Sequence, residues 1–317
     1  MNAYLFVHFV GTDSNEDEEQ IYFSISKNGR EWKTLNSGRT FLKSNVGECG
    51  VRDPYITRSP ETGRYYVFAT DLSIFRRSLT GERAVQWDLC QNRRQDNPSP
   101  GSQNIVVWES DDLVCWSDAR LEKVAPDDGG CYWAPECIWD KEKESFMVFG
   151  ASRTARHDYD ALQIFRSYTK DFRIFTEPEL YMDERNDRST GSPMHVFDTT
   201  ITECDGMYYR IYKTDRIKID MAESLDGEWR QVETNIHEIA PCHEGPTICR
   251  LNDSKKWCLM LDALSEPKGY HPFVTEDLAG GQFEPSDEII LPETLRFRHG
   301  TLIQIGMEEY ERLWNIR

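Results

Sequence analysis

Five polar side chains recur at equivalent points of five repeated segments along the chain. Each lies at the start of a short apolar run that a turn connects to a second apolar run. The five are Asp53, Glu136, Asp198, Glu244 and His299. Four of them are carboxylic acids, the groups with which many enzymes give and take protons during bond cleavage. The repetition therefore directs attention to acid–base chemistry that draws on several parts of one chain.

The first repeat shows how such a segment is built. Asp53 precedes Pro54, and a proline restricts the preceding residue to extended backbone geometry. Apolar runs at 55–56 and 65–68 flank a turn at 60–63, which predicts two short strands of a hairpin. We therefore expect the Asp53 carboxylate at the mouth of a hairpin.

The segments between these motifs are equally regular. Each contains an alternating strand, a turn and a closing aromatic residue that we assign to the core. The closing aromatics are Trp32, Trp116, Phe175, Trp229 and Phe283. About four short strands in each long period predict propeller blades, and only the tail 307–314 has helical periodicity.

We therefore predict an all-β fold, a five-bladed β-propeller that takes up residues 1–317 as a single domain. The strand at 4–9 is expected to complete the final blade and close the ring. Inner strands of a propeller point at one axis, so the five polar groups should surround one central pocket. Two polar stretches, 87–103 and 183–195, are expected to be long surface loops that wall this pocket.

Composition narrows the class of partner. The formal net charge of −18 disfavours nucleic acid and anionic membrane as partners, since both bind clustered Lys and Arg side chains. An uncharged or cationic small ligand is therefore favoured.

The cysteines and the start of the sequence concern location. Nine cysteines without a Cys-x-x-Cys pair, and a start that lacks signal-peptide features, favour a cytoplasmic location. Motifs of serine hydrolases, zinc proteases and nucleotide-binding proteins are absent from the sequence. The oligomeric state is left open.

The five motifs together resemble glycoside hydrolase family 43, whose members are five-bladed propellers that cleave arabinofuranosyl or xylosyl linkages with inversion. A lone Asp-Pro or Glu-Gly-Pro is ordinary turn chemistry, but five motifs in order on five repeats favour catalysis. The resemblance covers essentially the whole chain. It rests on Val51-Arg52-Asp53-Pro54, Trp133-Ala134-Pro135-Glu136, Phe197-Asp198-Thr199-Thr200, Glu244-Gly245-Pro246 and Arg298-His299-Gly300.

The resemblance implies a role for each of three carboxyl groups. Asp53 matches the general base, which activates a water, and Glu244 matches the general acid, which protonates the departing oxygen. Asp198 matches the third carboxylate, which orients the acid and keeps its pKa high. An inverting hydrolase holds acid and base roughly 6.5–9.5 Å apart, and a rigid propeller suits that requirement.

The resemblance also implies residues that contact the substrate or an ion. Trp133 is a candidate platform for a sugar face, Glu136 is expected to line the pocket, and Arg298 is expected to bind the substrate or the acid. His299 matches an axial histidine that holds a calcium ion or an ordered water; no other cofactor is implied. Two departures stand out, since Glu136 replaces a frequent aspartate and Thr199 replaces a proline.

The expected function is an inverting exo-glycosidase that releases terminal α-L-arabinofuranose from short plant-derived oligosaccharides. The alternative is a β-D-xylosidase on the same scaffold. Many family xylosidases carry a second β-sandwich domain, and the sequence shows no second module, which favours arabinofuranose. A hypothesis of a different class is a non-catalytic sugar-binding propeller.

Overall fold

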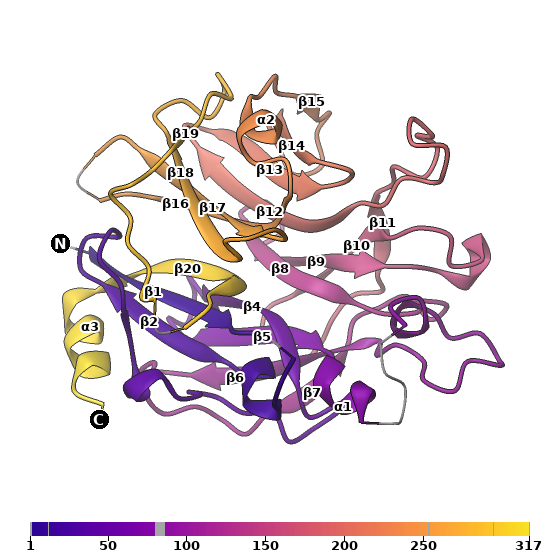
Figure 1. Cartoon of the computed structure of the whole chain (residues 1–317), viewed down its shortest axis with the longest axis horizontal. Coiled ribbons are helices and arrows are strands. Elements are labelled where there is room, and N and C mark those ends of the chain that lie inside the picture. Colours follow the sequence, from indigo (N-terminus) through magenta and orange to yellow (C-terminus); the bar gives the residue numbers. More distant parts are fainter. Residues whose placement is uncertain (1, 12, 80–85, 253, 294, 317) are drawn as a thin grey trace.

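The strands form five four-stranded antiparallel sheets, which we call blades I to V. The computed structural model describes residues 2–11, 13–79, 86–252, 254–293 and 295–316. The innermost strand of every blade contacts the innermost strands of both neighbouring blades, so the five sheets close into a ring (Figure 1). The predicted all-β fold with five propeller blades is confirmed.

In every blade the strands follow one another from the axis outward. Blade I contains β4 (Val51–Arg58), β5 (Tyr65–Asp71), β6 (Asn104–Ser110) and β7 (Arg120–Lys123). Blade II contains β8 (Trp133–Asp140), β9 (Ser145–Ser152), β10 (Gln163–Thr169) and β11 (Glu179–Met182). Blade III contains β12 (Phe197–Cys204), β13 (Met207–Lys213), β14 (Ile217–Ala222) and β15 (Arg230–Gln231). Blade IV contains β16 (His243–Arg250), β17 (Trp257–Ala263), β18 (Gly269–Thr275) and β19 (Glu284–Pro285). Blade V contains β20 (Arg298–Gly306), β1 (Asn2–Phe9), β2 (Tyr22–Ser26) and β3 (Lys33–Thr34).

Blade V is assembled from two distant parts of the sequence. Strand β1 pairs antiparallel with β20, where Ala3 lies opposite Ile305 and Leu5 lies opposite Ile303. Figure 1 shows the indigo β1 beside the yellow β20. This pairing closes the ring and leaves no open edge between its first and last strands. The prediction that the first strand completes the final blade is confirmed.

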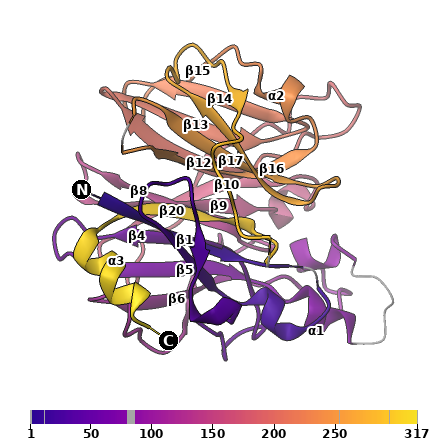
Figure 2. The same cartoon turned by 60° about the vertical axis from the view of Figure 1, so that its left-hand side comes forward.

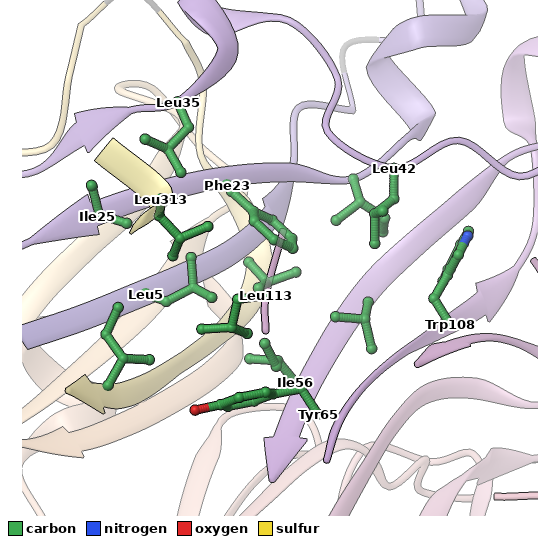
Figure 3. Packing of buried hydrophobic residues seen from close by; sticks show 14 of the residues in the cluster. Leu5, Phe23, Ile25, Leu35, Leu42, Ile56, Tyr65, Trp108, Leu113 and Leu313 are labelled. Atoms are coloured by element: carbon green, nitrogen blue, oxygen red, sulfur yellow. The ribbon is translucent and has the colours of Figure 1, made fainter. Parts of the chain in front are cut away.

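Hydrophobic side chains fill the space between each pair of neighbouring blades. One cluster, between blades V and I, contains Leu5 and Phe23 from blade V and Ile56 and Trp108 from blade I (Figure 3). The closing aromatics predicted from the sequence are divided among the five inter-blade clusters: Trp32, Trp116, Phe175, Trp229 and Phe283. Because each cluster joins two sheets, the packing holds the blades, and therefore the inner strands, at definite positions around the axis.

In the described part of the chain, helical structure is confined to short segments. The longest helix, α3 (Met307–Trp314), follows β20 directly and confirms the helical tail expected from its periodicity (Figure 2). The Glu309 side chain accepts a hydrogen bond from the Gly306 backbone N–H at 2.7 Å, which caps the helix. The other helical segments are α1 (Ile74–Ser78), α2 (Ile236–Ile239), η1 (Glu16–Glu19), η2 (Asn36–Gly38), η3 (Leu89–Gln91) and η4 (Ala155–His157). Among the residues that the structure describes, no helix has the length and apolar character needed to cross a membrane.

Candidate active site

Every inner strand carries a β-bulge at the same level of the propeller. In blade I the pairing with the second strand is interrupted between Arg52 and Tyr55, so two residues oppose one. The corresponding two-residue bulges begin at Asp53, Ala134, Asp198, Gly245 and His299. Bulges re-aim side chains and are common beside active sites, so this level of the axis is where the inner strands present their functional groups.

The bulges correct two expectations about the backbone. Asp53 and Asp198 have φ angles of 50° and 48°, so Asp53 does not adopt the extended geometry that Pro54 predicted. Left-handed backbone strains a residue other than glycine, although aspartate tolerates it better than most, and such strain is often stored at functional sites. The pairing of β4 with β5 on both sides of the bulge sets the backbone geometry of Asp53, and this effect outweighs the local preference that Pro54 imposes.

The second correction concerns register. Only Asp53, Asp198 and His299 occupy the same bulge position, whereas Glu244 lies one residue before it and Glu136 lies two residues after it. The five polar groups are therefore not equivalent, as the sequence repeats had suggested. A shift in register changes both the height and the direction of a side chain along the axis.

A cavity of about 560 Å³ opens at this level of the propeller. Five of the predicted groups line it together with Trp133: Asp53, Asp198, Glu244, Arg298 and His299. Trp87 and Gln91 of one predicted loop and His195 of the other also line the cavity, so both loops contribute to its wall as expected. The volume is typical of small-molecule sites, which span roughly 300–1,000 Å³.

Asp53 is held by a short relay of hydrogen bonds. The Thr70 hydroxyl donates to Asp53 Oδ2 at 3.1 Å and accepts from the Ala134 backbone N–H at 2.9 Å. Because a hydroxyl has one proton, the bond from Ala134 leaves that proton for the aspartate. Thr70 was not predicted, since it lies on a second strand without a motif. The relay orients the carboxylate for which the family resemblance implies the role of general base.

Asp198 connects blade III to blade IV. Its Oδ2 accepts a hydrogen bond from the Gly245 backbone N–H at 3.0 Å. Burial raises the pKa of Asp198 to about 8, and the neighbouring charge of Asp53 acts in the same direction. Gly245 follows Glu244 directly, so Asp198 helps to position the strand segment that carries the candidate acid.

Glu244 has the properties of a proton donor near neutral pH. Burial raises its pKa to about 8, and the charges of Asp198 and Asp262 add to the effect. Arg298 opposes the shift, with its Nη2 atom 3.5 Å from Glu244 Oε1. A carboxyl group with a raised pKa keeps its proton at the pH at which a glycosidic oxygen must be protonated.

Arg298 faces the cavity, as expected, but its strongest partner was not predicted. Its Nε donates to Asp262, a fully buried residue of β17. Asp262 lies directly opposite Glu244 in the pairing of β16 with β17. The available signal in the sequence was an acid at the end of an otherwise apolar strand.

Two tryptophans form an aromatic corner of the cavity. The rings of Trp87 and Trp133 meet edge to face, with centroids 5.8 Å apart, and both line the cavity. Trp133 therefore lies where a sugar platform was expected. Trp87 is 45% exposed, so its ring remains available to a ligand.

Glu136 does not lie where it was expected. It is only 3% exposed and is not among the residues that line the cavity, because its register places it directly after the two bulge residues. Burial raises its pKa well above the usual range, and its Oε2 atom has no partner among the described groups. A neutral, buried Glu136 cannot serve as the pocket-lining group that the sequence suggested.

His299 lines the cavity and approaches two carboxylates. Burial lowers the pKa of its imidazole despite the nearby charge of Asp53. Calcium binds six to eight oxygen ligands, and the described residues contain no group of three or more His, Cys, Asp or Glu side chains suited to a metal ion. A calcium ion held by His299 stays a prediction, and no step of the proposed reaction depends on it.

Comparison with known proteins adds a family and a set of similar folds. A family model for glycosyl hydrolases related to family 43, described as "Probable glycosyl hydrolase domain", matches residues 1–311. An α-L-arabinofuranosidase of Bifidobacterium longum subsp. longum is 28% identical over 224 residues. That match covers 65% of this chain but 19% of the relative, so the chain spans about a fifth of that protein's length.

Two solved structures illustrate the similarity of fold. A family-43 glycoside hydrolase protein of Bacillus licheniformis aligns with a TM-score of 0.56 and 15% identity, covering 96% of this chain and 56% of its own. A putative exo-β-1,3-galactanase of Bifidobacterium bifidum s17 aligns with a TM-score of 0.53 and 14% identity, covering 92% and 88%. At these identities the similarity concerns the fold.

Proposed function

The chain belongs to the glycosyl hydrolases related to family 43, and from this premise we propose that it is an inverting exo-glycosidase specific for terminal α-L-arabinofuranose. The observation that carries the proposal is the pairing, in one cavity, of an oriented aspartate with a buried glutamic acid. Asp53 accepts a hydrogen bond from the Thr70 hydroxyl, and the pKa of Glu244 is raised to about 8. These are the two proton-transfer groups that glycoside hydrolysis requires.

In the proposed reaction a single displacement breaks the glycosidic bond. A water molecule attacks the anomeric carbon while Asp53 takes one of its protons. Glu244 gives its proton to the departing oxygen as the bond from that oxygen to the anomeric carbon breaks. The products are the free sugar, with inverted configuration at that carbon, and the shortened oligosaccharide.

Asp198 acts through Glu244 in this scheme. Its hydrogen bond to the Gly245 N–H positions the backbone beside the acid, and when Asp198 ionises its charge raises the pKa of the acid. The assignment agrees with the role implied by the sequence motif.

Two observations favour release of a terminal sugar and, more specifically, of arabinofuranose. The site is a cavity of about 560 Å³ with an aromatic corner, a size suited to a small ligand such as the sugar at the end of a chain. The similar Bifidobacterium longum protein is named an α-L-arabinofuranosidase. A β-D-xylosidase on the same scaffold is the alternative, and a β-1,3-galactosidase is included in the test because of the galactanase among similar folds.

The proposal is tested with 4-nitrophenyl α-L-arabinofuranoside, β-D-xylopyranoside and β-D-galactopyranoside, measured side by side. Wild-type protein is expected to turn over the arabinofuranoside with the highest kcat/KM. A preference for the xyloside or galactoside would reject the sugar but keep the class. Binding of arabino-oligosaccharides by calorimetry, without turnover of any substrate, would indicate the non-catalytic sugar-binding propeller instead.

A further inference from the structure

Asp262 is a buried acid that the reaction scheme leaves without a role. It lies near the end of β17, its side chain is 0% exposed, and its backbone is the direct strand partner of Glu244. Enzymes and other proteins rarely bury an aspartate this completely unless it is paired or hydrogen-bonded. The contacts of Asp262 therefore indicate why it is there.

One oxygen of Asp262 serves two neighbours, both on β20. Oδ2 accepts from the Arg298 Nε and also from the His299 backbone N–H, the latter at 3.4 Å. The other oxygen, Oδ1, is buried and has no hydrogen-bond partner among the described groups. The carboxylate is thus aimed at the strand that carries Arg298, although this leaves half of its hydrogen-bonding capacity unused.

Arg298 is held on three sides and directs its remaining nitrogen at the acid. Besides the Asp262 contact, Nη1 donates to the Gly11 carbonyl at 3.4 Å and the guanidinium lies 5.5 Å from the centroid of the Phe9 ring. Nη2 lies 3.5 Å from Glu244 Oε1. A planar guanidinium with its other groups engaged has little freedom, so the orientation of Nη2 is set by its partners.

We propose that Asp262 is a positioning residue for acid catalysis: it holds and neutralises Arg298, so that Arg298 orients the Glu244 carboxyl group without removing its proton. The inference rests on the proposed function of Glu244 as the general acid. In this arrangement Oε1 accepts from Arg298, which leaves Oε2 to carry the proton toward the glycosidic oxygen. Once the proton has moved, the same contact stabilises the new carboxylate.

The charge of Arg298 explains why it needs Asp262 as a partner beside the candidate acid. An unpaired guanidinium beside a buried glutamic acid favours the ionised form of that acid, which cannot donate a proton. Asp262 supplies a compensating negative charge on the side of Arg298 away from the cavity, since Asp262 does not line the cavity and Arg298 does. Arg298 can then act as an orienting hydrogen-bond donor.

Blade III offers a matched control for a purely structural role. Asp220 and Arg210 form a buried ion pair between β14 and β13, with side chains 7% and 12% exposed and Nη2 2.7 Å from Oδ2. The Arg298 side chain is likewise 12% exposed. The residues of the blade III pair do not line the cavity, so the two pairs differ chiefly in their contact with the acid.

The test compares leaving groups, because acid catalysis matters most when the departing oxygen is a poor leaving group. We expect Asp262→Asn to lower kcat/KM for phenyl α-L-arabinofuranoside at least about tenfold more than for the 4-nitrophenyl glycoside, since general acid catalysis contributes about 10²–10⁴-fold. Asp220→Asn is expected to change both substrates by the same factor. Arg298→Lys, which lacks the planar fork, is expected to show the same selective loss as Asp262→Asn.

The outcomes separate this inference from the proposed function. Equal losses of Asp262→Asn on the two leaving groups would overturn the positioning role while leaving the glycosidase intact. If Asp262→Asn does not fold, as judged by its thermal unfolding, Arg298→Lys decides the matter by the same comparison. Should the wild type turn over none of the arabinosyl, xylosyl and galactosyl substrates, both the proposed function and this inference fail.

Discussion

Asp53 and Asp198 approach the same atom from blades I and III, since Nδ1 of His299 lies 3.5 Å from Asp53 Oδ1 and 3.9 Å from Asp198 Oδ1. All three residues occupy the bulge position of their inner strands. Burial lowers the pKa of the histidine, which disfavours an imidazolium that would compensate both acids. Burial is the main reason for the raised pKa of Asp198, and the nearby charge of Asp53 adds to it.

The first prediction concerns the alkaline limb of the pH–rate profile. Glu244 must be protonated to act as an acid, and its pKa is raised to about 8, so kcat/KM should fall as the pH rises through about 8. The pKa of Asp198 is also about 8, so its negative charge develops in the pH range where Glu244 loses its proton and raises the pKa of Glu244 there. Asp198→Asn removes that charge, so the limb should move to lower pH. Profiles of kcat/KM for the wild type, Asp198→Asn and the Asp220→Asn control measure the shift. An alkaline limb that Asp198→Asn leaves in place would contradict the assigned role of Asp198.

The second prediction concerns stability. The pKa of Asp198 is raised from 3.8 to about 8 by folding, so the folded state binds this proton more tightly than the unfolded state. Its contribution to stability is complete below about 3.8 and is lost as the pH rises through about 8. Each pH unit between pH 5 and about 8 is worth about 1.36 kcal/mol, and asparagine does not ionise, so Asp198→Asn should gain up to about 4 kcal/mol relative to the wild type between pH 5 and pH 9. Urea unfolding at the two pH values tests this, and a pH-independent difference would refute it.

The third prediction isolates proton donation. Glu244→Gln keeps the shape of the side chain but has no acidic proton, so kcat/KM for the phenyl glycoside should fall by about 10²–10⁴-fold. The loss on the 4-nitrophenyl glycoside should be much smaller, because that leaving group needs less protonation. Calorimetry with an arabino-oligosaccharide should show that binding is retained. Equal losses on both aryl glycosides would assign Glu244 a role other than the acid.

The fourth prediction concerns the aromatic corner. Trp87→Ala and Trp133→Ala remove apolar surface that contacts substrate in the ground state and the transition state alike, so KM for oligosaccharides should rise about three- to tenfold with little change in kcat. Trp116 packs between blades V and I, so Trp116→Ala should lower the free energy of unfolding with KM unchanged. Steady-state kinetics and thermal unfolding of the three variants distinguish these effects. A fall in kcat without a change in KM for Trp87→Ala would oppose a binding role.

The sequence predicted those features of the fold that are local and that repeat in every blade. Each blade repeats a strand, a turn and a closing aromatic, so the fold, the closing strand β1 and the inner-strand motifs could all be predicted. Register was harder, because the bulges depend on pairing with a second strand that the motif does not contain. This is why Glu136 was expected in the cavity and is instead buried directly after the bulge residues of its strand.

The same reasoning explains the residues that were missed. Thr70 and Asp262 lie near the ends of second strands, where a polar residue after an apolar run does not indicate which partner on another strand it contacts. Trp87 and His195 come from connections whose conformation depends on contacts with other blades. Such residues become visible only when the blades are packed around the axis.

The most direct test of the account follows the configuration of the first sugar released. Proton NMR during hydrolysis of 4-nitrophenyl α-L-arabinofuranoside should show β-L-arabinofuranose first, because a single displacement assisted by Asp53 inverts the anomeric carbon. Asp53→Asn should abolish this turnover while leaving the thermal unfolding transition close to that of the wild type. Initial release of the α-anomer, or full activity of Asp53→Asn, would contradict an inverting mechanism with Asp53 as its base.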